Sequence, residues 1–93
     1  MHNEILIAIE EVLHEKFIAA TIDRDQFVRP VLICRIHGFN RYVIVSNDGW
    51  IIVSSKGREI VIHASDPNSL DFVIRELTAD EATVLDRSPA NGF

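Results

Sequence analysis

The feature that most constrains the fold is a central stretch, residues 29–64, whose hydrophobic pattern has a period of two. β-Branched residues occur throughout it, and short segments containing glycine, asparagine and aspartate interrupt it. This period places successive side chains on opposite faces of a sheet. It predicts four β-strands, at about residues 29–37, 41–46, 50–55 and 58–64. Short connections favour antiparallel neighbours, so we expect a four-stranded antiparallel meander.

The segments between the predicted strands have the residues of tight turns. Asn47-Asp48-Gly49 fits a three-residue hairpin loop, in which a type I turn is closed by a glycine in the left-handed region. Gly38-Phe39-Asn40 and Lys56-Gly57 predict the other two reversals. The last reversal is open to two interpretations, because Ser55-Lys56-Gly57 also fits a three-residue loop. We prefer the two-residue loop because it matches polarity across the strands, although it requires a positive φ at Lys56.

Helical patterns flank the strands on both sides. Residues 4–20 carry apolar side chains at helical spacing and predict an N-terminal helix, followed by a polar connection over residues 21–26. Asp66-Pro67 predicts the start of a second helix, with Asp66 as N-cap and Pro67 in the first helical position. Its apolar residues follow the i, i+3, i+4, i+7 pattern and are Leu70, Val73, Ile74 and Leu77.

The end of the chain completes the predicted domain. Residues 78–81 have a capping-box pattern, Thr-Ala-Asp-Glu, which predicts a short third helix to about Asp86. Residues 88–93 predict a flexible tail. We therefore expect one α+β domain over residues 1–87, with the helices packed on one face of the sheet.

The predicted loop lengths divide the strand side chains between two faces. One set is apolar and is expected to meet the helices: Leu32, Cys34, Ile36, Val43, Val45, Ile51, Val53, Ile60 and Ile62. The other set is mixed: Val31, Ile33, Arg35, His37, Tyr42, Ile44, Ser46, Trp50, Ile52, Ser54, Glu59, Val61 and His63. A three-residue loop at Ser55–Gly57 would move Glu59, Val61 and His63 to the helix-covered face. The mixed face is the candidate functional surface.

Charge and cysteine content exclude several classes of partner and site. Nine basic against fourteen acidic residues give a net charge of −5, which disfavours nucleic acid and anionic membranes as partners. The single cysteine, Cys34, forms no internal disulfide and supplies no cysteine-based zinc site. The start of the chain has no basic n-region, and its apolar run, Ile5–Ile9, is short, so a cytoplasmic location is expected. No glycine-rich phosphate loop or other cofactor motif occurs, so no cofactor is expected.

No combination of reactive side chains predicts a catalytic or metal site. Cys34 and His37 lie on opposite faces of one predicted strand, so they do not form a nucleophile–base pair. Cys34 is instead expected to be buried and unreactive. His37 and His63 are roughly 14 Å apart across three strand spacings, too far to share a metal ion. Glu10 and His14 share a helix face, but two ligands do not complete a metal site.

Trp50 beside His63 is the most suggestive pair on the mixed face. The predicted register makes the two residues direct cross-strand neighbours and places Arg35 in the adjacent row. The expected binding residues are Arg35, His37, Tyr42, Ile44, Trp50, Ile52 and His63. We expect a non-catalytic interaction module that forms a homodimer through this face. One alternative is a small enzyme or ligand-binding dimer with a cleft around Trp50, His63 and Arg35; a weaker one is an acidic protein that covers a basic partner.

Overall fold

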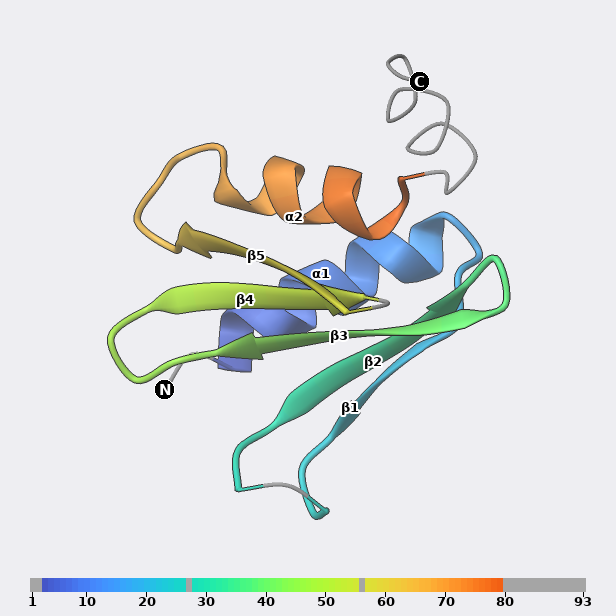
Figure 1. Ribbon diagram of the computed structural model, residues 1–93, viewed down its shortest axis with the longest axis horizontal. Helices are drawn as coiled ribbons and strands as arrows, with labels where there is room; N and C mark the ends of the chain where they lie inside the picture. The colour runs from blue at the N-terminus through green and yellow to red at the C-terminus, as the bar shows by residue number, and fades with distance from the viewer. Residues whose placement is uncertain (1–2, 27, 56, 80–93) are drawn as a thin grey trace.

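The structure is a computed structural model that describes residues 3–26, 28–55 and 57–79. In chain order its elements are α1 (Asn3–Glu15), β1 (Ala20–Asp23), β2 (Val31–Ile36), β3 (Phe39–Val45), β4 (Trp50–Ser55), β5 (Arg58–His63) and α2 (Ser69–Leu77). The strands form one antiparallel meander in chain order, and both helices contact it. The two helices lie on the same side of the sheet (Figure 1). The predicted α+β fold is confirmed in this outline.

The sheet contains one strand more than the sequence predicted. The first helix ends at Glu15 rather than near residue 20, and residues 20–23, expected as helix end and polar connection, form β1 beside β2. The helix ends because Phe17 adopts a left-handed conformation, with φ at 62°. The N–H groups of Phe17 and Ile18 then donate to the carbonyls of His14 and Leu13, at 3.0 and 2.9 Å, which is a Schellman motif. Glycine usually occupies this position, so a phenylalanine there gave no sign of the helix end.

The second helix begins later than predicted. Asp66 is not its N-cap: α2 begins at Ser69, and Asn68 occupies the N-cap position without a side-chain hydrogen bond. The Asp66 carboxylate accepts the Asn68 N–H at 2.8 Å, and its carbonyl accepts the Ser69 N–H at 2.9 Å. Asp66 therefore stabilises a turn through Pro67 that precedes the helix, which is the other structure this residue type favours.

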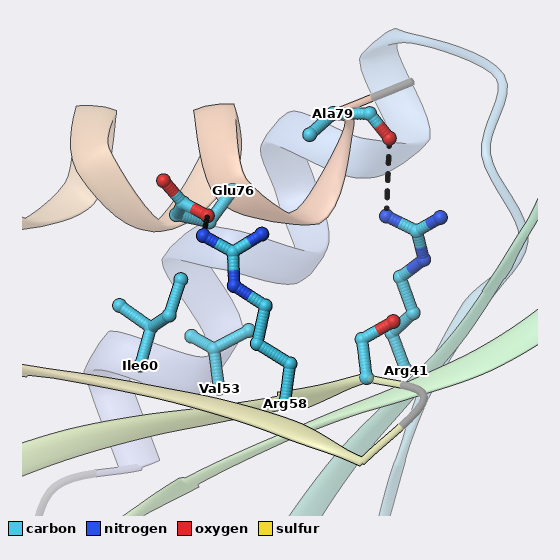
Figure 2. A pocket seen from close by; sticks show the side chains of 7 residues that line it. Arg41, Val53, Arg58, Ile60, Glu76 and Ala79 are labelled. Atoms are coloured by element: carbon cyan, nitrogen blue, oxygen red, sulfur yellow. Dashed lines mark hydrogen bonds and ion pairs between the residues drawn. The ribbon is translucent and has the colours of Figure 1, made fainter. Parts of the chain in front are cut away.

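The end of α2 is held by a residue from the sheet. Thr78 is its C-cap, and the Arg41 side chain reaches from β3 to the Leu77 carbonyl at 2.7 Å. The same side chain donates to the Ala79 carbonyl at 3.4 Å (Figure 2). The predicted third helix, with Asp86 near its end, and the predicted tail over residues 88–93 lie outside the described residues.

The strand register confirms two of the three predicted reversals. Ile44 lies opposite Ile52, and Gly49 closes the intervening loop with φ at 90°. Ser55 lies opposite Arg58, so the last reversal is the two-residue loop. The first reversal differs: His37 and Gly38, both with positive φ, form the turn, and the residues from Phe39 onward belong to β3. His37 consequently lies in a turn and not within a strand of the mixed face.

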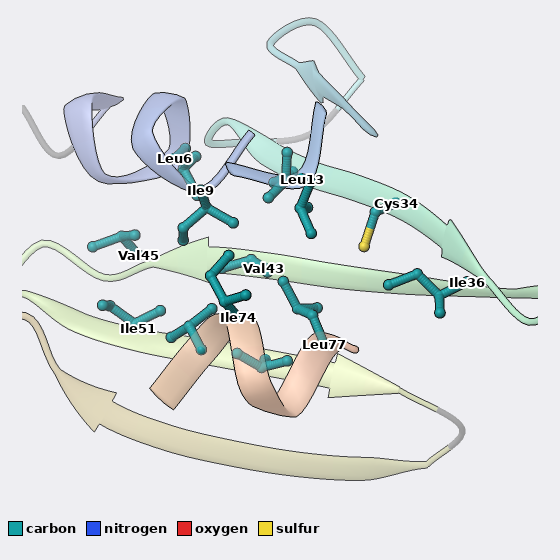
Figure 3. Close-up of a cluster of buried hydrophobic side chains, with 13 residues drawn as sticks. Leu6, Ile9, Leu13, Cys34, Ile36, Val43, Val45, Ile51, Ile74 and Leu77 are labelled. Atoms are coloured by element: carbon teal, nitrogen blue, oxygen red, sulfur yellow. The ribbon is translucent and has the colours of Figure 1, made fainter. Parts of the chain in front are cut away.

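The core lies between the two helices and one face of the sheet, named here the covered face (Figure 3). Both helices contribute buried residues to it: Leu6, Ile9, Leu13, Val73, Ile74 and Leu77. The strands contribute Leu32, Cys34, Ile36, Val43, Val45, Ile51 and Val53. The covered face is not wholly apolar, since Arg41, in register with Cys34, is only 2% exposed. Burial of Cys34, at 1% exposed, confirms the assignment of faces.

Candidate functional site

The candidate site is the opposite surface of the sheet, named here the open face. Two of its cross-strand rows are defined by direct pairing: Ile44, Ile52 and Val61 form one, and Tyr42, Ser54 and Glu59 lie in the next. Ile33 pairs with Tyr42 from β2, and Trp50 lies one row beyond Ile52. The apolar members of these rows are adjacent and form what we call the apolar patch: Ile33, Tyr42, Ile44, Trp50, Ile52 and Val61.

The apolar patch is accessible from solvent. Tyr42, Trp50 and Val61 are 38%, 44% and 51% exposed, whereas Val43, the neighbour of Tyr42 on the covered face, is fully buried. Ile33, Ile44 and Ile52 are half-buried by their neighbours in the sheet. Both described helices pack on the covered face, so no element within residues 3–26, 28–55 and 57–79 covers the patch. A cluster of large apolar side chains left in water is typical of an interaction surface.

Trp50 and His63 form a corner at one end of the patch. Their ring centroids are 4.6 Å apart with the ring planes at 89°, an edge-to-face contact. The His63 Nδ1 accepts the Ser65 N–H at 3.1 Å, and its Nε2 donates to the Asp48 carbonyl at 2.8 Å. A backbone N–H only donates and a carbonyl only accepts, so the neutral ring carries its proton on Nε2. Both ring nitrogens therefore hold neighbouring turns together and do not face an open cleft.

The structure separates Arg35 from Trp50 and His63, which the sequence placed in adjacent rows of the mixed face. Trp50 lies at the Ser46 end of β3, where its carbonyl accepts the Ser46 N–H, whereas Arg35 lies opposite Asn40 at the other end. Six residues along β3 separate Ser46 from Asn40, which corresponds to roughly 20 Å. The Arg35 guanidinium donates instead to the Asn40 side chain at 3.4 Å. His37 lies in the adjacent turn, at the same distant end of the sheet.

A small cavity of about 40 Å³, with both charged and apolar side chains in its lining, lies beneath the C-terminal end of α2 (Figure 2). Its lining residues are Arg41, Val53, Ser55, Arg58, Ile60, Glu76 and Ala79. Arg58 forms an ion pair with Glu76 at 3.8 Å, and Arg41 donates to the end of the helix, where a positive charge is favourable. A cavity of this size has room for about one or two water molecules. Sequence reasoning missed Arg41, although its strand parity with Val43 indicates the covered face.

Cys34 supports a structural role and no catalytic one. Burial raises the pKa of its thiol to about 11, and this effect outweighs the positive charge of Arg41, which lowers the pKa. The thiolate, which is the reactive form, is therefore disfavoured. No group of three or more histidine, cysteine, aspartate or glutamate side chains in the described part of the chain is placed to hold a metal ion.

An apolar groove of about 410 Å³ runs between the first turns of the two helices. Its lining residues are Glu4, Ile5, Ala8, Ile9, Ile51, Ser69 and Leu70. Neither described helix has the length and apolar composition needed to span a membrane.

The chain was compared with known protein families, curated proteins and solved structures. None of the three comparisons gave a match.

Proposed function

We propose that this protein is a non-catalytic interaction module that forms a homodimer through the apolar patch of its open face. The single observation that carries the proposal is the continuity of the patch, which runs from Tyr42 through Ile44 and Ile52 to Val61 without a described element above it. Removing such a patch from water is favourable by about 25 cal/mol per Å² of apolar surface.

A second copy of the chain is the simplest cover for this surface. In a two-fold interface each patch meets its own copy, so one sequence supplies both complementary halves. Trp50 is the natural anchor because a large aromatic side chain held by His63 loses little conformational freedom on binding. Ser54 and Glu59, one row from the patch centre, supply a polar rim.

The ligand-cleft alternative has less support than the dimer. Arg35 and His37 are far from Trp50, and the ring nitrogens of His63 already bond to Asp48 and Ser65. The open face therefore offers an apolar surface and no convergent set of polar groups among the described residues. Small-molecule sites usually need such polar groups.

The experiment is sedimentation of Trp50→Ala beside Phe39→Ala. The two aromatic residues are 44% and 41% exposed, but Phe39 pairs with Ile36 at the far end of the covered face. Trp50→Ala is expected to weaken association by about 2 kcal/mol, a roughly 30-fold increase in the dimer Kd. Phe39→Ala is expected to leave the Kd unchanged. A wild-type protein that is monomeric at high micromolar concentration, with Trp50 fluorescence open to quenching, would contradict the proposal.

A further inference from the structure

The two edges of the sheet differ in how their backbone groups are satisfied. At the start of β1, the Ala19 carbonyl accepts the Arg35 N–H from β2. Because hydrogen-bonded and non-hydrogen-bonded positions alternate along a strand, the backbone N–H and C=O of the next residue, Ala20, point away from the sheet. The His14 side chain covers this position, because its Nε2 donates to the Ala20 carbonyl at 3.0 Å. The β1 edge is therefore short and partly closed by a side chain.

The β5 edge is longer and open. The Ala64 N–H donates to the Gly49 carbonyl at 2.8 Å, which sets the alternation along β5. The N–H and C=O groups of Glu59, Val61 and His63 consequently point away from β4. Among the described residues, the His63 carbonyl accepts the Asp66 N–H at 3.0 Å, whereas the N–H and C=O groups of Glu59 and Val61 have no backbone partner. Figure 1 shows β5 at the margin of the sheet, and α2 packs chiefly over α1 and β4.

Residues 60–62 of this edge lack the usual protection against pairing, and the charged Arg58 and Glu59 lie only at its beginning. Natural edge strands carry proline, lysine or a bulge that prevents another strand from adding. Residues 60–62 of β5 are Ile-Val-Ile, and they pair with β4 in an uninterrupted register. An unprotected strand with high β-propensity is a template for strand addition.

We propose that β5 pairs antiparallel with β5 of a second copy, across a two-fold axis at Val61. In this register the N–H and C=O of Val61, the C=O of Glu59 and the N–H of His63 meet complementary groups. The His63 carbonyl, which already accepts the Asp66 N–H, would accept a second hydrogen bond from Glu59 of the other copy. Ile60 of one copy lies opposite Ile62 of the other on the covered side, where both residues are half-buried in the single chain. The two sheets become one continuous sheet with both open faces on the same side.

The side chains favour this register over its neighbours. An axis at Val61 places Glu59 of one copy opposite His63 of the other, whereas an axis at Glu59 would bring two carboxylates together, which is unfavourable. An axis at His63 would leave the outward groups of Glu59 without partners from the strand. The chain is thus complementary to itself at this edge, and this complementarity selects a second copy over an unrelated peptide.

This interface uses the outward backbone groups of β5 and goes beyond the proposed function, although the Val61 side chain also belongs to the apolar patch. The edge axis is perpendicular to the sheet, whereas an axis that brings two open faces together lies parallel to it. A protein that used both surfaces would be a tetramer built from two packed sheets. Amide exchange along β5 therefore reports on the edge interface, and sedimentation of Trp50→Ala reports on the open-face interface.

The direct test is residue-resolved amide hydrogen exchange on the wild-type chain. The amides of Ile60 and Ile62 bond to β4 and are protected in any assembly. The outward amides of Glu59, Val61 and His63 are expected to exchange at least about tenfold more slowly than in an unpaired strand, and to lose this protection on dilution. Outward amides that exchange freely in the associated protein, or that stay protected in a monomer, would overturn edge pairing.

Val61→Pro is the matched perturbation, with Val61→Thr as its control. The proline ring replaces the outward N–H and blocks the edge without removing a bond to β4, whereas threonine keeps the N–H and the β-branched shape. Val61→Pro is expected to abolish protection at Glu59 and His63, and Val61→Thr is expected to retain it. Because the Val61 side chain also belongs to the apolar patch, protection of these amides is the deciding readout for both variants. Unchanged protection in Val61→Pro would refute edge pairing. Trp50→Ala, which tests the open face, should leave protection at these amides in place.

Discussion

The two faces of the sheet carry similar apolar side chains but have different environments. Ile51 and Ile52 are neighbours in β4 with the same side chain; Ile51 is 1% exposed beneath the helices, and Ile52 lies half-buried on the open face. Because strand geometry sends them to opposite sides, the difference comes from the helices and not from the residues. Hydrophobicity alone therefore does not tell a core face from an interaction face.

Each face of the sheet carries an arginine, and the two arginines differ in burial and in hydrogen-bond partners. Arg41 lies on the covered face, 2% exposed, and bonds to the end of α2, whereas Arg35 is exposed on the open face and bonds to Asn40. Burial of a charged group is tolerated only where hydrogen bonds replace its hydration, and the end of α2 supplies carbonyls for this purpose. The hydrogen bond of Arg41 on the covered face therefore matters more for stability than that of Arg35 on the open face.

The largest expected difference between the faces is in the free energy of unfolding of Ile51→Ala and Ile52→Ala. Ile51→Ala leaves a cavity in the core and should cost about 2–5 kcal/mol. Ile52→Ala should cost less than about half as much, because its site opens to solvent in the single chain. Urea unfolding at low protein concentration, with equal slopes for both variants, measures the difference. Similar costs would mean that the open face is covered after all.

Arg41→Met, compared with Arg75→Met, tests the buried charge. Arg41→Met removes the donor to the Leu77 carbonyl and should cost about 1–3 kcal/mol, since a buried acceptor loses its partner. Arg75 pairs with Asp71 on the outer surface of α2 at 2.8 Å, with both side chains about three-quarters exposed. Its loss should cost about 0.5 kcal/mol or less. Thermal unfolding of both variants provides the measurement, and a neutral Arg41→Met would show that packing alone holds the helix end.

Alkaline pH should destabilise the protein through Cys34. Its thiol has a pKa of about 11 in the folded protein and an ordinary value near 9 when unfolded. The contribution is fully present below pH 9 and is lost as the pH rises toward 11, because the unfolded chain releases the proton first. The slope should be about 1.4 kcal/mol per pH unit. Unfolding free energies of the wild type and Cys34→Ala across this range isolate the effect; parallel curves would contradict it.

The smallest expected effect concerns the corner of Trp50 and His63. Gly49 and Gly38 both have positive φ, near 90° and 83°, so alanine at either position should cost about 1 kcal/mol in backbone strain. A Cβ at Gly49 would lie 3.2 Å from the His63 ring, whereas one at Gly38 has nothing within 4 Å. Gly49→Ala should therefore cost a further increment of about 0.5 kcal/mol and shift the ring resonances of His63. Equal costs with an unmoved ring would show that the corner is loose.

Much of the open face could be predicted from the sequence. The three-residue loop ending at Gly49 and the two-residue loop ending at Gly57 determine the pairing of β3, β4 and β5, and with it the face of Trp50 and His63. The distance of Arg35 from this pair could not be predicted. The sequence placed the first reversal at residues 38–40, whereas the structure turns at His37 and Gly38.

What the sequence determined by itself is local: the period-two pattern, the turn residues and the spacing of apolar residues in the helices. These depend on backbone geometry within a few residues of each position. The tertiary structure decided the end of the first helix at Phe17, the pairing of residues 20–23 with β2, and the burial of Arg41. The helix end uses local hydrogen bonds that only the structure reveals, because a phenylalanine does not signal it. The other two depend on partners distant in the chain, because β1 gains its hydrogen bonds from β2 and Arg41 from the end of α2. Such partners exist only once the sheet and helices have assembled, so no local pattern reveals them.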